Sequence, residues 1–122
     1  MNTTTQLPAC PVETTLTLIG DKWKVLIIRD LLTGTKRFNE LMRSVTGITQ
    51  KVLTSHLRAM EAAGLVNRTV YPEVTPRVEY SLTERGKSVV PILQSICRWA
   101  GAFHKEDYEN TMIQCRKCDY RN

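Results

Sequence analysis

Residues 47–64 read GITQKVLTSHLRAMEAAG, and this stretch decides the fold that the sequence predicts. Thr49 is typical of a helix N-cap, because its hydroxyl can accept a hydrogen bond from a free amide of the first turn. Gly64 is typical of a helix end, because glycine takes up the left-handed conformation without the steric cost of a Cβ. The stretch therefore predicts one helix that begins after Thr49 and stops at Gly64.

The predicted helix has an apolar face and a polar face when its residues are placed at about 100° intervals. The apolar face consists of Val52, Leu53, Leu57 and Met60. The polar face has no carboxylate except Glu61 near its far edge, and it consists of Gln50, Lys51, Thr54, Ser55 and Arg58. Lys and Arg neutralise phosphates, while Gln, Thr, Ser and Arg can read base edges in a major groove. This polar face is compatible with a helix that reads DNA and with an ordinary solvated helix. The segments on either side distinguish the two interpretations.

A second short helix is expected immediately before this one, over residues 38–45, with a short strand at 35–37. Its apolar side chains recur at the spacing of a packed helical face, at Phe38, Leu41, Met42 and Val45. The dipeptide Thr46-Gly47 provides a tight turn between the two helices. Two short helices joined in this way, the second with a polar outer face, are the helix-turn-helix pattern.

After Gly64 the periodicity changes from that of a helix to that of a strand. Residues 65–71 and 77–82 alternate, and the segment PEVTP at 72–76 predicts a proline-rich turn between them. A hairpin directly after a recognition helix is the wing of a winged helix. Its cations, Arg68 and Arg77, are expected to meet a phosphate backbone or a minor groove. A plain solvated hairpin is the alternative, because Glu73 and Glu79 dilute the positive charge.

Apolar helices flank this core on both sides. Residues 10–20 and 83–104 are expected to be helical, with Pro91 kinking or breaking the second segment. A further apolar helix, capped by Asp21, is expected to run to Gly34 and to hold Trp23 as a packing residue. The outer apolar surface is wide for so small a core, which predicts dimerisation helices. A simple cover for a monomer's core is the alternative.

The length and composition predict one domain, with residues 21–82 as its DNA-binding core. A flexible arm at 1–9 and a charged tail at 105–122 are expected outside the helices. The chain has 122 residues and a net charge of +5, which is compatible with a polyanionic partner. No apolar run approaches the ~20 residues that cross a membrane. The polar start of the chain argues against a secretory signal and predicts a cytoplasmic protein without a membrane partner.

The four cysteines suggest thiol chemistry rather than a disulfide scaffold. Cys10 precedes Pro11 at the expected helix start, where free amides and the helix dipole favour a thiolate. Cys10 is therefore either a reactive thiol or only a small polar cap. Cys115 and Cys118 form a CxxC pair in the tail, which fits a solvated tail, a redox pair or half of a zinc site. A small thiol-redox or zinc-binding protein using this pair is the alternative function.

No catalytic constellation is recognisable in the sequence. It lacks a Ser/His/Asp set, a pair of carboxylates in a cleft pattern, a glycine-rich phosphate loop and a cluster of metal ligands. His56 falls among apolar neighbours and is expected to be packed and hydrogen-bonded, and His104 is expected to end the last helix. If the chain is a helix-turn-helix protein, the sequence therefore predicts that it is not an enzyme and that it binds no cofactor and no metal.

A series of short motifs follows in a specific order along residues 10–104. The series is Cys10, Gly20-Asp21-Lys22-Trp23, Arg37-Phe38-Asn39-Glu40-Leu41, Gly47-Ile48-Thr49, Leu53, Leu57-Arg58, Gly64-Leu65-Val66, Pro76, Glu79-Tyr80-Ser81-Leu82-Thr83, Gly86 and Trp99. In these motifs the chain resembles the HxlR-type transcriptional regulators, a winged-helix group related to the MarR regulators. The resemblance implies a homodimer that binds pseudo-palindromic operator DNA. Several family members sense electrophiles, quinones or oxidants through a cysteine near the N-terminus, and Cys10 matches that position.

The residues and the resemblance together predict a sequence-specific DNA-binding regulator. Its fold is expected to be mainly α with a small β-hairpin wing. The predicted DNA contacts are Arg37, Asn39, Thr49, Gln50, Lys51, Thr54, Ser55, Arg58, Arg68 and Arg77. Thiol modification at Cys10 by a small electrophile or oxidant is the predicted switch. Some relatives place a partner thiol in the recognition helix, where this sequence has no cysteine. A winged helix used only for protein contacts remains a further alternative.

Overall fold

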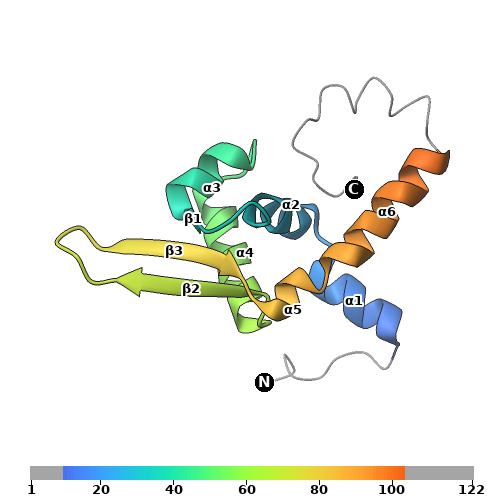
Figure 1. Ribbon diagram of the computed structural model, residues 1–122, viewed down its shortest axis with the longest axis horizontal. Helices are drawn as coiled ribbons and strands as arrows, with labels where there is room; N and C mark the ends of the chain where they lie inside the picture. Colours follow the sequence, from blue (N-terminus) through green and yellow to red (C-terminus); the bar gives the residue numbers. More distant parts are fainter. Residues whose placement is uncertain (1–9, 104–122) are drawn as a thin grey trace.

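A computed structural model describes residues 10–103 and shows a mainly helical chain with one small sheet (Figure 1). The elements are α1 (Pro11–Ile19), α2 (Lys22–Leu31), β1 (Lys36–Arg37), α3 (Phe38–Ser44), α4 (Gln50–Ala62), β2 (Val66–Tyr71), β3 (Arg77–Leu82), α5 (Glu84–Lys87) and α6 (Val90–Phe103). The predicted arm, the tail, His104, Cys115 and Cys118 lie outside the described residues. None of the helices within residues 10–103 is long and apolar enough to cross a membrane.

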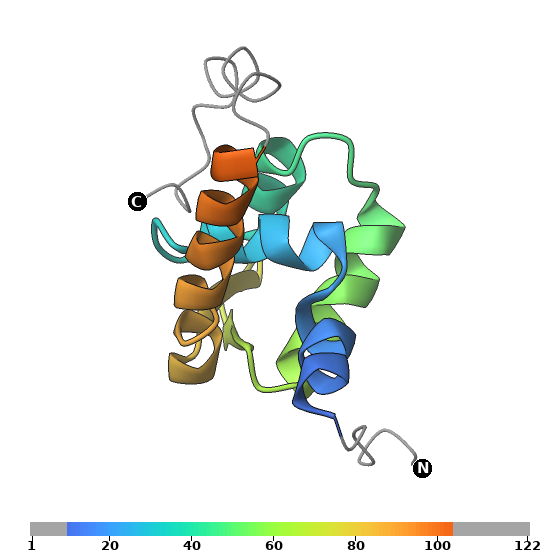
Figure 2. The same ribbon diagram turned by 90° about the vertical axis from the view of Figure 1, so that its right-hand side faces the viewer.

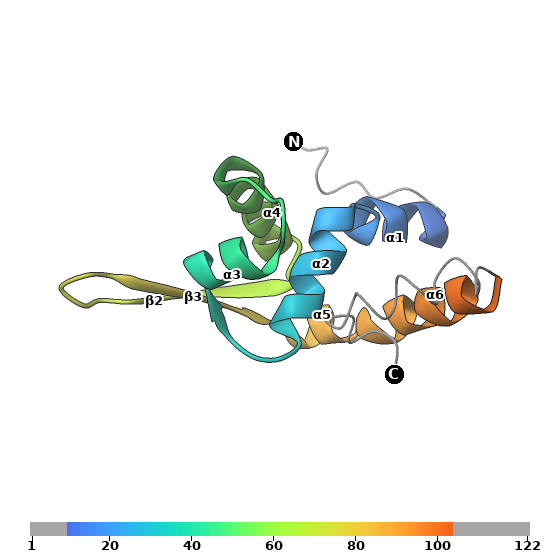
Figure 3. The ribbon, with the colours of Figure 1, turned by 90° about the horizontal axis from the view of Figure 1, so that it is seen from above.

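The helices α2, α3 and α4 form the centre of the molecule, and the β2–β3 hairpin projects from it (Figure 1). Seen from above, the hairpin extends to one side while α1 and α6 lie at the opposite end (Figure 3). Figure 2 looks onto that end and shows both helices in front of the core. The predicted wing and the surface that the sequence predicts for dimerisation therefore lie at opposite ends, with α4 between them.

Helix α4 begins and ends as the sequence predicts. The Thr49 hydroxyl accepts a hydrogen bond from the Val52 amide at 3.2 Å, which satisfies one donor of the first turn. Gly64 has a φ of 77°, a conformation that strongly favours glycine. Leu53, Leu57 and Met60 are buried on the inner face of the helix. They belong to one core with residues of α2, α3 and the hairpin, so burial of this apolar face holds α4 in place.

The sheet has three antiparallel strands in the order β1-β3-β2. Tyr80 and Leu82 of β3 are buried in the core and Val78 is half-buried. In β2 only Val66 is buried, because the hairpin extends beyond the helices that could cover it. Helix α3, the turn at Gly47, helix α4 and this hairpin are together a winged helix-turn-helix, so the predicted fold class is confirmed.

The end of α2 differs from the prediction by three residues, whereas α1 and α3 agree with it to within one residue at each end. Helix α2 ends at Leu31 rather than at Gly34, because the Thr33 hydroxyl donates to the Asp30 carbonyl and the Gly34 amide to the Leu31 carbonyl. These bonds replace a further helical turn.

The segment predicted as one helix at 83–104 consists of two helices, α5 and α6, with a break at residues 88–89. Pro91 lies at the second position of α6, where its missing amide proton removes no helical hydrogen bond. The break that Pro91 predicts is therefore present, but it falls just before the proline.

Candidate nucleic-acid interface

The polar face of α4 is presented to solvent as the sequence predicts. Its side chains line one shallow hollow on the outside of the helix, formed by Gln50, Lys51, Thr54, Ser55 and Arg58. Thr54 is half-buried, the others are exposed, and Thr49 is exposed directly before the helix. The face offers two cations beside amide and hydroxyl groups, which are the group types that contact phosphates and base edges.

A groove of about 540 Å³ separates α4 from the hairpin. From α4 it is lined by Gln50, Thr54, Arg58 and Glu61, and from the hairpin by Arg68, Val78 and Tyr80. The structure therefore brings part of the predicted recognition face and one predicted wing cation to a single depression. Its cations come from two different elements, so a phosphodiester backbone in the groove could be contacted from both sides.

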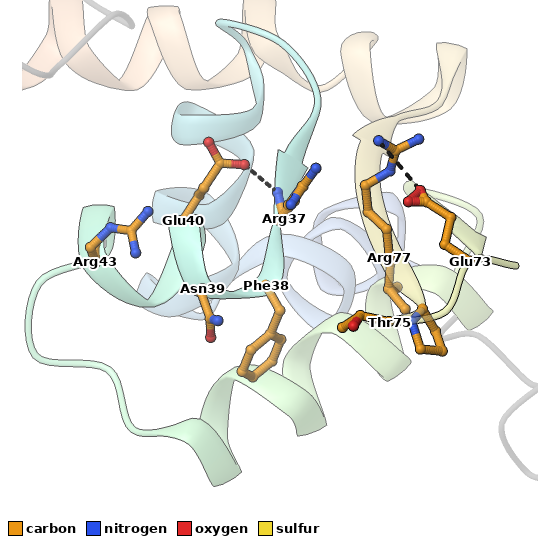
Figure 4. Close-up of a pocket in the computed structure, with 10 residues that line it drawn as sticks. Arg37, Phe38, Asn39, Glu40, Arg43, Glu73, Thr75 and Arg77 are labelled. Atoms are coloured by element: carbon orange, nitrogen blue, oxygen red, sulfur yellow. Dashed lines mark hydrogen bonds and ion pairs between the residues drawn. The ribbon is translucent and has the colours of Figure 1, made fainter. Parts of the chain in front are cut away.

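A second groove, of about 950 Å³, lies between the start of α3 and the end of the hairpin (Figure 4). It is lined by Arg37, Phe38, Asn39, Glu40, Arg43, Glu73, Thr75, Pro76, Arg77 and Val78. Phe38 and Val78 line both grooves, so the two depressions adjoin. Sequence reasoning missed Arg43. The signal was available, because Arg43 lies four residues after Asn39 and so shares its face of α3.

The two wing arginines lie on opposite faces of the hairpin. Arg68 pairs with Tyr80 across the strands, and Arg77 pairs with Tyr71. Because cross-strand partners share a face, Arg68 points with Tyr80 toward α4. Arg77 lies on the other face, where its guanidinium is 3.5 Å from a Glu79 carboxylate oxygen, 3.8 Å from one of Glu73, and 4.2 Å from the centre of the Tyr71 ring. Among residues 10–103, Arg68 forms no such ion pair.

The predicted contacts near α3 also point in two directions. Arg37 is exposed at the N-cap of α3, and its amide donates to the Glu40 carboxylate at 2.7 Å. Its side chain extends to the same side as that of Arg77, whereas Asn39 and Phe38 extend toward α4 (Figure 4). Asn39 is therefore placed beside the α4 face, and Arg37 lies on the outer side of the sheet.

Cys10 is the N-cap residue of α1, as predicted, and its side chain is exposed. The thiol forms no capping hydrogen bond, and the backbone carbonyl accepts the first helical bond, from the Thr14 amide at 3.0 Å. The geometry thus gives no support to the interpretation of Cys10 as a side-chain cap. Cys97 is half-buried on α6. Within the part of the chain that the structure describes, no three His, Cys, Asp or Glu side chains are grouped to hold a metal ion.

Helices α1 and α6 lie at the end of the molecule opposite the hairpin (Figure 3), and both expose large apolar side chains. Val12 and Leu16 of α1 are 65% and 62% exposed. On α6, Ile92, Ile96 and Trp99 are 44%, 55% and 59% exposed. Scattered exposed apolar residues are ordinary, but several on two helices at the same end of the molecule are typical of a contact surface.

His56 is packed and hydrogen-bonded, as predicted. Its Nδ1 lies 2.9 Å from the Val52 carbonyl oxygen, and its Nε2 lies 3.2 Å from Oδ1 of Asp21, the N-cap residue of α2. Burial alone would raise the pKa of the Asp21 carboxyl. Hydrogen bonds from the Trp23 amide and the His56 ring outweigh that effect and hold the pKa below its ordinary value.

The fold and the polar surface together define a winged helix-turn-helix protein of the kind that regulates transcription. A model described as HxlR-like helix-turn-helix matches residues 18–108, and the chain therefore belongs to that family. It is 51% identical over 102 residues to an HTH-type transcriptional regulator of Methanothermobacter thermautotrophicus, a match that covers 84% of this chain and 77% of the relative. Membership of this family makes the protein a regulator and not an enzyme, as the sequence predicts.

Solved structures agree with this assignment. A MarR-family transcriptional regulator from Enterococcus faecalis V583 superposes with a TM-score of 0.74 at 41% identity, covering 89% of this chain and 99% of that one. The redox regulator HypR in its oxidised form superposes with a TM-score of 0.70 at 48% identity, covering 76% of this chain and 96% of HypR. The identities are high enough that the similarity extends beyond the fold to the family.

Proposed function

We propose that the protein binds a specific sequence of double-stranded DNA through α4 and the hairpin. The observation that carries this proposal is the groove shared by Arg58 of α4 and Arg68 of β2, next to a helix face of cations, amide and hydroxyls. Such a groove fits the backbone strand that runs between a major groove holding α4 and the neighbouring minor groove. The role requires a compartment that holds DNA, consistent with the predicted cytoplasmic localisation.

The proposed contacts divide by position. Base edges are read by Gln50, Lys51, Thr54, Ser55 and Arg58, which project from the outer face of α4, with Thr49 at its start. Asn39 and Arg68 flank this face and contact the backbone. Arg37 and Arg77 remain proposed backbone or minor-groove contacts, but their position on the outer side of the sheet makes them peripheral ones.

We further propose a homodimer that joins two copies through α1 and α6. The exposed Leu16, Ile96 and Trp99 supply apolar surface for this contact, at the end of the molecule that leaves α4 and the hairpin free. A twofold axis there presents two recognition helices to one duplex, so the expected operator is pseudo-palindromic.

Thiol modification at Cys10 is the proposed switch. The support is its exposed position at the start of α1, beside the proposed dimer contact, and the similarity to HypR, which is named a redox regulator. A quinone would form a bond between the Cys10 sulfur and a ring carbon, with the thiol proton passing to the quinone. The added group would shift α1 against the second copy and so change the spacing of the two α4 helices.

Selection of a duplex from random DNA, followed by gel-shift titration, tests the proposal. Arg58→Ala and Lys51→Ala are compared with wild type on the selected duplex and on a random one. Loss of a base contact should cost about 1–3 kcal/mol and relax specificity, whereas loss of a phosphate contact should weaken both duplexes alike. A protein that enriches no sequence would rule the proposal out and favour a winged helix that contacts only proteins. A protein whose DNA binding is unchanged by both substitutions would show that α4 is not the recognition helix.

A further inference from the structure

His56 lies on α4 but outside the proposed DNA surface. Around the helix axis it is separated by about 140° or more from Lys51, Arg58 and Glu61, the charged residues of this helix. Only 18% of its side chain is exposed, against 44% for that of Asp21. The His56 ring therefore faces α2 and contacts no DNA in the arrangement proposed above.

Both ring nitrogens of His56 face hydrogen-bond acceptors. The Val52 carbonyl oxygen lies 2.9 Å from Nδ1, and Oδ1 of Asp21 lies 3.2 Å from Nε2. A carbonyl and an ionised carboxylate can only accept, and a neutral imidazole carries a single N–H. Both contacts can be hydrogen bonds at the same time only when the ring carries two protons and a positive charge.

The Asp21 side of this contact lies at the junction of α1 and α2. Gly20 alone separates Asp21 from the end of α1, and a Cβ at Gly20 would overlap the Leu16 carbonyl, so the junction is close-packed. Asp21 also accepts from the Trp23 amide at 2.7 Å as the N-cap of α2. The Trp23 ring lies against Gly47, in the turn that leads into α4. The start of α2 thus holds α4 at two points, the turn and His56.

We infer that His56 is a positioning residue whose protonated ring ties the recognition helix to the α1–α2 junction, so that sequence-specific DNA binding weakens when the ring loses its proton. The inference rests on the DNA-binding function proposed above. Reading base edges requires side chains placed to within a fraction of a bond length, whereas attraction to phosphates survives a small displacement of the helix. Specific binding should therefore respond to this proton more than nonspecific binding does.

Other charged groups near the pair are engaged elsewhere or lie on other faces. Lys22 Nζ is 4.4 Å from the centre of the Trp23 ring. Lys24 contributes its backbone amide to the Asp21 carboxylate, and its ammonium group forms no ion pair with a described residue. Arg68 of β2, the strand packed on α4, lines the groove on the far side of the helix. Among the described residues, Asp21 is the one acidic partner that forms an ion pair with His56.

The pH dependence of the His56–Asp21 contact involves the protonation of both side chains. Because the pKa of Asp21 is lowered from 3.8 in the folded protein, the carboxylate's contribution is present above that value and is lost as the pH falls through the lowered pKa. Histidine is the side chain that changes charge between about pH 5 and pH 8. The contact has both hydrogen bonds only while the His56 ring carries two protons, and it loses one of them when the ring becomes neutral.

The test compares full-length wild type, His56→Gln and Asp21→Asn on the duplex enriched by wild type and on a random duplex, from about pH 5.5 to 8 at fixed ionic strength. Asn caps a helix as well as Asp does, so Asp21→Asn removes the charge and keeps the cap. Gln at position 56 keeps a polar side chain that does not titrate. His104→Gln is the matched control, because it removes the other histidine of the chain.

Over this pH range wild type should lose about three- to tenfold more affinity for the enriched duplex than for the random one. His104→Gln should behave like wild type, and His56→Gln and Asp21→Asn should show no such difference. If the affinities of His56→Gln for the two duplexes changed with pH as those of wild type do, the inference would be overturned, but the proposal of DNA binding would not be affected. Failure of wild type to enrich any duplex would overturn the proposed function instead. Nitrogen NMR of the free protein gives a direct test: a His56 ring with one N–H at the pH of tightest specific binding would contradict the inference.

Discussion

Arg68 and Arg77 belong to one hairpin but lie on opposite faces of it. Arg68 faces the groove beside α4, whereas Arg77 lies between two carboxylates on the outer face. In the sequence the two arginines are equivalent wing cations. Their difference arises from the strand register, which pairs Arg68 with the buried Tyr80 and Arg77 with the exposed Tyr71.

This arrangement predicts unequal effects on DNA binding. Arg68→Ala should weaken binding to all sequences alike and lower the salt slope of log K by about 1, because one phosphate contact is lost. Arg77→Ala should have a clearly smaller effect, because Glu73 and Glu79 already offset its charge. Fluorescence anisotropy titrations at several salt concentrations measure both quantities. Equal losses for the two variants would contradict the assignment of faces.

The apolar end of the molecule predicts the assembly state. Ile96→Glu should raise the dimer dissociation constant by more than about tenfold, because an unpaired carboxylate would be buried in the contact. Val74→Glu is the matched control, since Val74 is also an exposed apolar residue but lies at the hairpin tip. Sedimentation equilibrium distinguishes the two. A dimer that tolerates Ile96→Glu would remove α6 from the interface.

Cys10 predicts a response to thiol reagents. A quinone or a hydroperoxide should lower the affinity of wild type for its selected duplex by about fivefold or more, and Cys10→Ser should not respond. Cys97→Ser should respond like wild type, because Cys97 is half-buried within α6. Affinity before and after treatment, with mass spectrometry to locate the modification, provides the measurement. An equal response in wild type and Cys10→Ser would exclude this thiol as the switch.

Thr83 predicts a stability effect away from the DNA surface. Its hydroxyl donates to the Gly64 carbonyl at 2.6 Å and accepts from the Gly86 amide at 2.9 Å, so it links the end of α4 to α5. Thr83→Ala should lower the free energy of unfolding by about 1–2 kcal/mol, because a cap and a second hydrogen bond are lost. Thr83→Ser keeps the hydroxyl and should remain close to wild type. Urea unfolding followed by circular dichroism compares the three proteins.

Local chemistry in the sequence was sufficient to predict most of the elements. Thr49 and Asp21 were predicted as caps, and each accepts a hydrogen bond from an amide of its helix. Caps act over two or three residues, so no knowledge of the rest of the fold is needed. The change of period at Gly64 likewise predicted the hairpin. The end of α2 was missed because its last carbonyls are satisfied by a turn, which the apolar pattern does not reveal.

The candidate site was predictable as a list of residues but not as a surface. Helical periodicity placed Gln50, Lys51 and Arg58 on one face of α4, since that face depends on a single helix. The grooves involve two or more elements, so the sequence could place Arg43 on the α3 face of Asn39 but could not place it beside the hairpin.

The sequence by itself determined the order of the elements, the ends of α4 and the chemistry of its outer face, because these depend on contacts between residues close in the chain. The tertiary structure alone decided which wing arginine faces α4, and it alone brought His56 to Asp21, 35 positions away along the numbered chain. Strand register and helix packing are set by burial of the whole core at once. A shift of β2 by one residue in register would turn Arg68 to the outer face without changing any local preference.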